Sequence, residues 1–303
     1  MNFTALLPPS AALVLAPLLL GIVNRTKAIF GGRRGQPLLQ LYFDLFKLLG
    51  KGATYSQTTT WLFSAGPIIG LGAVFVAALL VPLGGVSGSL SFTGDLLLFA
   101  YLLAMMRFFT VLAALDTGSS FEGMGASREV LISALAEPGL FLCLATLARQ
   151  TGSLALSKML GEITTRSWLQ HGPALALVAA ALLVVILAEN ARIPVDDPNT
   201  HLELTMIHEV MVLDHGGPDL AFISYGSALK LWVLSALFVG VVVPVRTGQV
   251  LVDAAAGLAG MFLLAVVIGV VESTMARLKL LRVPNLLVGA TALAILALVL
   301  VVK

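Results

Sequence analysis

The sequence predicts an all-α integral membrane protein, a bundle of about eight transmembrane helices with an amphipathic helix lying in the membrane interface. Three observations predict this class. The chain of 303 residues is 58% hydrophobic and only 11% charged, where a soluble domain carries roughly 25% charged residues. Its mean hydropathy is +1.00. Long apolar segments also recur along the chain, with polar stretches between them.

Eight apolar segments are long enough to cross a bilayer, whose core needs about 20 residues of helix. We expect them to form a single membrane domain over residues 1–303. The segments are roughly 4–24, 61–83, 95–115, 129–149, 173–189, 219–244, 250–272 and 283–302.

Lys and Arg are unevenly divided between the loops. Eleven lie after the first, third, fifth and seventh segments, and five lie on the other side. Cytoplasmic loops carry the excess of positive charge, so these loops are predicted to be cytoplasmic and both termini to face outward. No Lys or Arg precedes the first apolar segment, which predicts a retained helix rather than a cleaved signal peptide. We therefore expect a multi-pass protein of the inner (cytoplasmic) membrane, with cytoplasmic loops 25–60, 116–128, 190–218 and 273–282.

The first cytoplasmic loop contains an amphipathic segment, 36–51. Its polar residues Gln40, Asp44, Lys47 and Lys51 are spaced four, three and four apart, and apolar residues fill the other sides. This pattern predicts a helix in the membrane interface. Before it, Arg33 and Arg34 stand between glycines, which suits either an anion-binding turn or a flexible basic turn that sets orientation.

Four ionisable residues fall within or at the ends of membrane segments, where charges are costly. Arg107 and Glu137 are each about eight residues from the predicted cytoplasmic ends of neighbouring segments, so we expect them to pair. Lys230 lies near the middle of its segment and Glu189 at the end of another. Two interpretations remain open: a buried polar path that carries protons, or structural ion pairs that fix the packing of the helices.

The loop after the third segment carries both signs of charge. Ser127 is predicted to cap the fourth helix, with Glu129 in its first turn. Asp116, Glu122 and Arg128 are not explained by helix capping, and they are candidates for contact with a cytoplasmic partner.

The longest polar stretch runs from Glu189 to Asp219 and holds three of the four histidines. Prolines end the fifth helix there, and a short helix is predicted over roughly 201–213, with His201, His208 and His215 on one face. Seven residues of helix separate successive histidines by about 10 Å, so no two can bind one metal ion. A docking face or a proton-exchanging surface is the better interpretation, because the pKa of histidine lies near working pH.

Composition argues against nucleic-acid binding and against an iron–sulfur cluster bound by this chain. The net charge of +2 does not suggest binding to nucleic acid. Its single cysteine, Cys143, cannot ligate an iron–sulfur cluster, which needs about four thiolates. Any redox centre must therefore lie on a partner.

Several motifs resemble a known family. Glu189-x-x-Arg192-x-Pro194-x-Asp196 followed by Glu203 resembles the signature of subunit 1 of respiratory complex I, as does Gly-Arg33-Arg34-Gly before the amphipathic segment. The loop from Leu115 to Glu129, with Glu137-Pro138 after it, is similar to the branch of formate hydrogenlyase and energy-converting [NiFe] hydrogenases.

The resemblance implies a membrane subunit that anchors a soluble arm and begins a path for protons. By position, Glu189, Arg192, Asp196 and Glu203 match the charged loop near the quinone chamber of complex I. Arg128 and Glu129 match the hydrogenase form of the loop after the third helix. This chain has Asn199 and His201 where complex I has further acids, which favours the hydrogenase branch.

The resemblance also implies the partners. They are hydrogenase-like large and small subunits, an iron–sulfur subunit, antiporter-like membrane subunits and the lipid bilayer. Iron–sulfur clusters and the NiFe centre would belong to those subunits, and a quinone is a candidate ligand. The alternatives to this function are the quinone-site subunit of a complex I-type NADH/quinone oxidoreductase and a self-sufficient ion transporter.

Two sets of candidate site residues result. The candidate proton path comprises Glu137, Arg107, Lys230, Glu189 and Glu203. The candidate partner-docking or quinone-chamber surface comprises Arg33, Arg34, Asp116, Glu122, Arg128, Glu129, Arg192, Asp196, Asp197, His201, His208 and Glu209.

Overall fold

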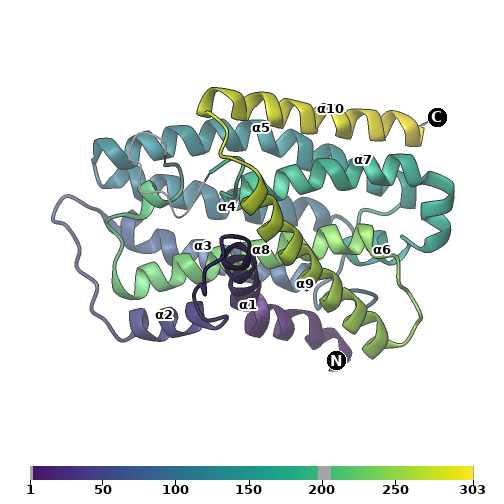
Figure 1. The fold of residues 1–303 in the computed structure, drawn as a ribbon, viewed down its shortest axis with the longest axis horizontal. Coiled ribbons are helices and arrows are strands. Elements are labelled where there is room, and N and C mark those ends of the chain that lie inside the picture. The colour runs from purple at the N-terminus through teal and green to yellow at the C-terminus, as the bar shows by residue number, and fades with distance from the viewer. Residues whose placement is uncertain (1–2, 197–205, 303) are drawn as a thin grey trace.

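The computed structural model describes residues 3–196 and 206–302, and the regular elements of this part of the chain are all helices, joined by loops, without a strand (Figure 1). Eight of its helices are long and apolar enough to cross a membrane, as expected. They are α1 (Leu7–Phe30), α3 (Trp61–Leu80), α4 (Asp95–Asp116), α5 (Ser120–Thr151), α7 (Thr165–Glu189), α8 (Gly217–Val242), α9 (Val250–Thr274) and α10 (Val283–Val302). The shorter elements are α2 (Gln40–Leu49), α6 (Leu156–Gly161) and the 3-10 helices η1 (Phe3–Leu6), η2 (Glu209–Val212) and η3 (Leu280–Arg282).

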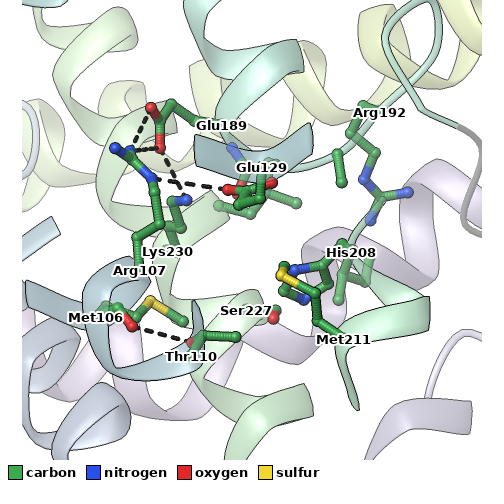
Figure 2. Close-up of a pocket in the computed structure, with 14 residues that line it drawn as sticks. Met106, Arg107, Thr110, Glu129, Glu189, Arg192, His208, Met211, Ser227 and Lys230 are labelled. Atoms are coloured by element: carbon green, nitrogen blue, oxygen red, sulfur yellow. Dashed lines mark hydrogen bonds and ion pairs between the residues drawn. The ribbon is translucent and has the colours of Figure 1, made fainter. Parts of the chain in front are cut away.

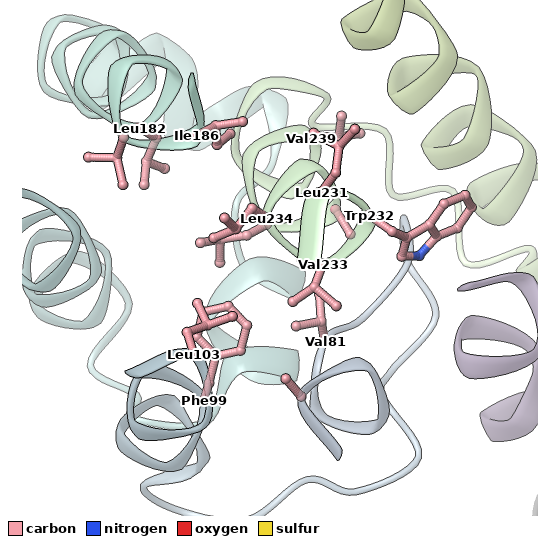
Figure 3. Packing of buried hydrophobic residues seen from close by; sticks show 14 of the residues in the cluster. Val81, Phe99, Leu103, Leu182, Ile186, Leu231, Trp232, Val233, Leu234 and Val239 are labelled. Atoms are coloured by element: carbon pink, nitrogen blue, oxygen red, sulfur yellow. The ribbon is translucent and has the colours of Figure 1, made fainter. Parts of the chain in front are cut away.

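Helix α8 is the centre of the bundle. In the most apolar 18 residues of this helix, 78% are buried inside the protein, against 22–50% in the other seven candidate spans. Helices α1, α2, α3, α7 and α9 all pack against it, and α10 lies along α5 and α7 (Figure 1). In Figure 3, Leu231, Val233 and Leu234 of α8 face side chains of neighbouring helices, such as Phe99 and Leu182. A polar residue on α8 is therefore held deep inside the protein.

The amphipathic helix is present as α2, and it packs against α1 and α8. Gln40 donates a hydrogen bond to Asp44 one turn later, at 2.9 Å. Phe43 and Phe46 are 58% and 76% exposed, as expected for a helix whose apolar side enters lipid. Arg33 and Arg34 lie in the exposed turn before this helix.

Helix α5 begins nine residues earlier than predicted, at Ser120. The predicted loop 116–128 is therefore mostly helix, and Ser127 is not a cap, because its hydroxyl donates to the Met124 carbonyl inside α5. Glycine is needed at 125 because a Cβ there would lie 2.2 Å from Val210 Cγ1 in the segment packed against α5. With 32 residues, α5 is about 48 Å long and extends beyond a bilayer core of about 30 Å.

The prediction of a helix over 201–213 is wrong for residues 206–213, the part that the structure describes. The only helical element there is the 3-10 helix η2. His208 and His215 lie in different surroundings rather than on one face. His215 stacks on Phe63, with ring centroids 3.9 Å apart and planes at 9°. His201 lies outside the described residues, as do Asp197 and Glu203.

The close approach of α1 to the segment before α2 gives a test of the fold. A Cβ on Gly21 would lie 2.0 Å from the Leu38 carbonyl oxygen, whereas a Cβ on Gly72 would meet nothing within 4 Å. We expect Gly21→Ala to destabilise the protein by roughly 1–3 kcal/mol, because backbone must move. Gly72→Ala should be neutral or stabilising by up to about 1 kcal/mol, since alanine favours helix. Thermal unfolding of the two purified variants measures the difference, and equal melting temperatures would contradict the close contact.

Candidate functional site

Four helices bring ionisable side chains together around Arg107 of α4 (Figure 2). Its guanidinium donates to Glu137 of α5, and to both carboxylate oxygens of Glu189, the last residue of α7, at 2.5 and 2.6 Å. Lys230 of α8 places its Nζ 2.8 Å from Glu189 Oε2. Arg107 Nε lies 3.6 Å from Glu129 Oε1 on α5. We call these five residues the buried ion cluster.

The predicted pairing of Arg107 with Glu137 is confirmed. The sequence also placed Lys230 and Glu189 in the same candidate set, and the structure pairs them directly. Glu129 was assigned to the start of a helix and to partner docking. It instead lies nine residues into α5 and faces Arg107, because α5 begins at Ser120. This position of Glu129 was missed in the prediction because the start of the helix was placed too late.

The buried ion cluster does not balance its own charge. It holds three carboxylates and two cations, so its formal charge is 2 − 3 = −1. Buried charge without compensation is strongly unfavourable, so one carboxylate must hold a proton or meet a further cation. Glu137 is the most accessible of the three, since its side chain is 40% exposed against 13% for Glu129 and 2% for Glu189. Glu137 is therefore the carboxylate of the cluster that reaches the outer face of the bundle.

A small cavity adjoins the cluster and has a volume of about 70 Å³. Its walls include Arg107, Glu129, Glu189 and Lys230, with His208 at one side (Figure 2). About 10–15 Å³ of such space holds one water molecule, so several waters fit between these polar groups. Pockets for small organic ligands are typically about 300–1,000 Å³. The described walls thus enclose a space suited to water rather than to a large ligand.

His208 lies outside the membrane-spanning helices, at the wall of this cavity. Burial lowers the pKa of His208, and the Lys230 ammonium lowers it further, to about 4. The imidazole is therefore neutral at neutral pH and can exchange hydrogen bonds with water in the cavity. It does not add a fixed positive charge to the site.

The chain after α7 is held by side chains from distant helices. Arg192 Nη1 lies 3.3 Å from Glu272 Oε1 of α9, and Lys27 Nζ of α1 lies 2.8 Å from Glu272 Oε2. Arg277 approaches Asp196 to 2.8 Å. The same Asp196 carboxylate accepts hydrogen bonds from the backbone N–H groups of residues 207 and 208. Asp196 therefore joins both described ends of the stretch that precedes η2.

Three residues of the predicted docking surface bind this chain itself. Asp116 accepts hydrogen bonds from Thr60, through the backbone N–H at 2.6 Å and the hydroxyl at 2.8 Å. Glu122 is only 1% exposed and accepts the Asp214 backbone N–H at 3.2 Å. Arg128 donates to the Met206 carbonyl at 2.8 Å. The contacts of Glu122 and Arg128 position the segment before α8, whereas Asp116 joins the end of α4 to the start of α3.

The remaining docking candidates are dispersed. Arg33 and Arg34 are exposed, and Glu209 lines a second cavity between α1 and α2. The described residues contain no group of three or more His, Cys, Asp or Glu placed to hold a metal ion.

Comparison with known proteins shows similarity along nearly the whole chain. Residues 4–302 match the family described as NADH dehydrogenase. Formate hydrogenlyase subunit 4 of Escherichia coli (strain K12) is 34% identical over 308 residues, which cover 98% of this chain and 98% of that protein. Hydrogenase-4 component C of the same organism is 32% identical over 294 residues, or 94% of this chain and 91% of that protein. The membrane-bound sulfane sulfur reductase, an archaeal respiratory membrane complex, contains a chain of the same fold, with a TM-score of 0.85, 22% identity and 98% coverage of both chains.

Glu189 should be critical for stability because it holds two buried cations at once. Removing one partner of a buried ion pair typically costs about 3–5 kcal/mol, so we expect Glu189→Gln to lower the melting temperature strongly. Glu162→Gln is a matched control, since Glu162 is 44% exposed and lies 4.0 Å from Lys158. That change should alter stability by less than about 1 kcal/mol. Thermal unfolding of both variants measures the contrast, and a similar small effect would contradict a central role for Glu189.

Proposed function

Since the chain belongs to the NADH dehydrogenase family of complex I subunit 1-like membrane proteins, we propose that it anchors a hydrogenase-type respiratory complex and couples its redox chemistry to proton movement. The buried ion cluster carries this proposal. It places a surplus negative charge, a water-sized cavity and a partly exposed carboxylate together inside a membrane bundle. Its partners would be hydrogenase-like large and small subunits, an iron–sulfur subunit and antiporter-like membrane subunits.

The proton path would use the cluster as its centre. Waters in the cavity and the neutral imidazole of His208 provide hydrogen-bond partners on one side. Glu137 provides a titratable group on the other side, in an open apolar groove between α4 and α5. Arg107 and Lys230 stabilise the carboxylates in their charged form. The chain would move protons while its partners carry out the redox chemistry.

The redox centres would belong to the partners. Cys143 is the one thiol in the sequence, and it is fully buried between apolar side chains. It cannot supply the set of thiolates that iron–sulfur and NiFe centres need. The loops after α1, α4, α7 and α9 would face the cytoplasm and the soluble arm, as the excess of Lys and Arg favours. The membrane would be the inner (cytoplasmic) one.

The hydrogenase-type function is favoured over a quinone site by the names of the relatives, a formate hydrogenlyase subunit and a hydrogenase component. A quinone ring with its tail needs a chamber near the usual range for organic ligands, about 300–1,000 Å³. The cavity on the His208 side of the cluster, with about 70 Å³, is below this range, whereas the open groove beside Glu137 has about 570 Å³. The names of the relatives, a subunit and a component of larger assemblies, favour a complex over a self-sufficient transporter.

Isolation of the protein with its partners tests the anchoring function. We expect a tagged copy, extracted in a mild detergent, to bring hydrogenase-like, iron–sulfur and antiporter-like subunits that mass spectrometry identifies. Recovery of the chain alone, stable and monodisperse, would instead support a self-sufficient transporter. Recovery with a quinone-reducing enzyme would support the quinone-site alternative.

Substitution of Glu137 tests the coupling function. Glu137→Gln keeps a hydrogen-bond acceptor for Arg107 but cannot exchange a proton at neutral pH. We expect proton uptake by inverted membrane vesicles to fall to background, while the complex still assembles and catalyses its redox reaction. Glu162→Gln, at an exposed site, should leave both activities unchanged. Normal proton uptake in the Glu137→Gln vesicles would rule out a required role for Glu137.

A further inference from the structure

A second cavity lies beside the one at the buried ion cluster. It has a volume of about 180 Å³ and lies between α1, α2 and the chain after α7. Its lining is largely polar, with Asn24, Gln36, Gln40, Asp44 and Glu209 among the residues. Gln36 is exposed, so the cavity opens at the surface beside the amphipathic helix. We call this space the inlet.

The inlet and the cluster cavity share two wall residues, Leu20 and Arg192. Leu20 is apolar and comes from α1, whereas Arg192 comes from the chain after α7. Figure 2 shows the Arg192 side chain on the far side of the pocket from Arg107, near His208. Water passing from the surface to the cluster by this route must therefore pass Arg192.

Arg192 is held in this wall by a fixed support. The Glu272 carboxylate accepts a hydrogen bond from Arg192 Nη1 at 3.3 Å. Its other oxygen lies 2.8 Å from Lys27 Nζ. About one turn before Glu272, α9 is in close contact with α1, because a Cβ on Gly269 would lie 2.6 Å from Thr26 Cβ. The carboxylate that holds Arg192 is therefore itself rigidly placed.

The group that holds the shared wall residue Arg192 is positively charged, whereas Asp44 and Glu209 on the other walls of the inlet are acidic. Arg192, Lys27 and Glu272 together carry 2 − 1 = +1, next to a cluster of −1. A fixed arginine at a narrow passage repels hydronium and other cations, as arginine does in selective pores. Both its bulk and its charge oppose entry to the cluster cavity.

We propose that Arg192, positioned by Glu272 and Lys27, is the gate between a surface inlet and the buried ion cluster, and controls the access of water and cations to it. The role of this gate in coupling rests on the proposed function, but the access that it controls does not. Removing the guanidinium would join the two cavities. Loss of the bond to Glu272 would let the Arg192 side chain move out of the wall.

Thiol labelling in the assembled complex tests the gate without requiring turnover. In a Cys143→Ser background, Ser227→Cys places a thiol in the cluster cavity and Asn24→Cys places one in the inlet. The probe is methyl methanethiosulfonate, a small neutral reagent, and labelling is measured by mass spectrometry of this chain's peptides. We expect Asn24→Cys to react in every background. Adding Arg192→Ala should speed the labelling of Ser227→Cys at least about tenfold, which corresponds to about 1.4 kcal/mol of barrier.

Further variants separate gating from damage to the fold. Glu272→Gln keeps Arg192 but weakens its support, so it should also speed labelling of Ser227→Cys, and it serves as the test where Arg192→Ala prevents assembly. Arg246→Ala removes another arginine, which follows the C-terminal end of α8 and binds the backbone carbonyls of Leu160 and Gly240, and it should leave labelling unchanged. With Arg192→Lys, a cationic aminoethyl reagent should remain excluded from Ser227→Cys.

Three outcomes would overturn the gate. These are equal labelling of Ser227→Cys with and without Arg192→Ala and Glu272→Gln, equal acceleration by Arg246→Ala, or no labelling of Asn24→Cys in any background. Each outcome is independent of the Glu137→Gln result, which tests proton coupling rather than access.

Discussion

The interaction on which the site depends is the ion pairing of one carboxylate, Glu189, with two cations from different helices. It binds Arg107 of α4 through both oxygens and Lys230 of α8 at 2.8 Å. Each of these cations would be strongly unfavourable alone in a low-dielectric interior. Because Glu189 is the last residue of α7, the end of that helix is fixed relative to the central helix. The chain that follows then begins at a defined place beside the cavity.

The packing of the other helices places these charged side chains close enough to pair. Helix α8 is surrounded by other helices, so Lys230 is kept away from lipid. Helix α5 contributes Glu129 and Glu137 two turns apart, and they approach Arg107 from different sides. A membrane bundle cannot rely on the hydrophobic effect between its helices, so tight packing and polar contacts must specify their positions. The buried ion cluster supplies contacts of this kind and is also the centre of the proposed proton path.

The number and order of the membrane helices follow from apolar length alone, and the equal depth and opposite signs of Arg107 and Glu137 were enough to predict their pairing. Other features depend on packing that a single sequence does not reveal. Gly123 and Gly125 made the start of α5 resemble a loop, whereas Gly125 allows that helix to approach its neighbour. The contact of Arg192 with Glu272 joins residues 80 positions apart, and nothing local to either residue indicates it.

Two adjoining groups of buried charge have opposite sign. The buried ion cluster carries −1, and the group formed by Arg192, Lys27 and Glu272 carries +1, so together they are neutral. Charges in a protein interior interact more strongly than in water, because the surroundings screen them less. Under the proposed function, a proton bound at Glu137 would neutralise the cluster and weaken its attraction for Arg192. The charge state of a carboxylate at one side of the bundle would then be linked in energy to the position of an arginine at the other, which is the kind of link that the proposed coupling function requires.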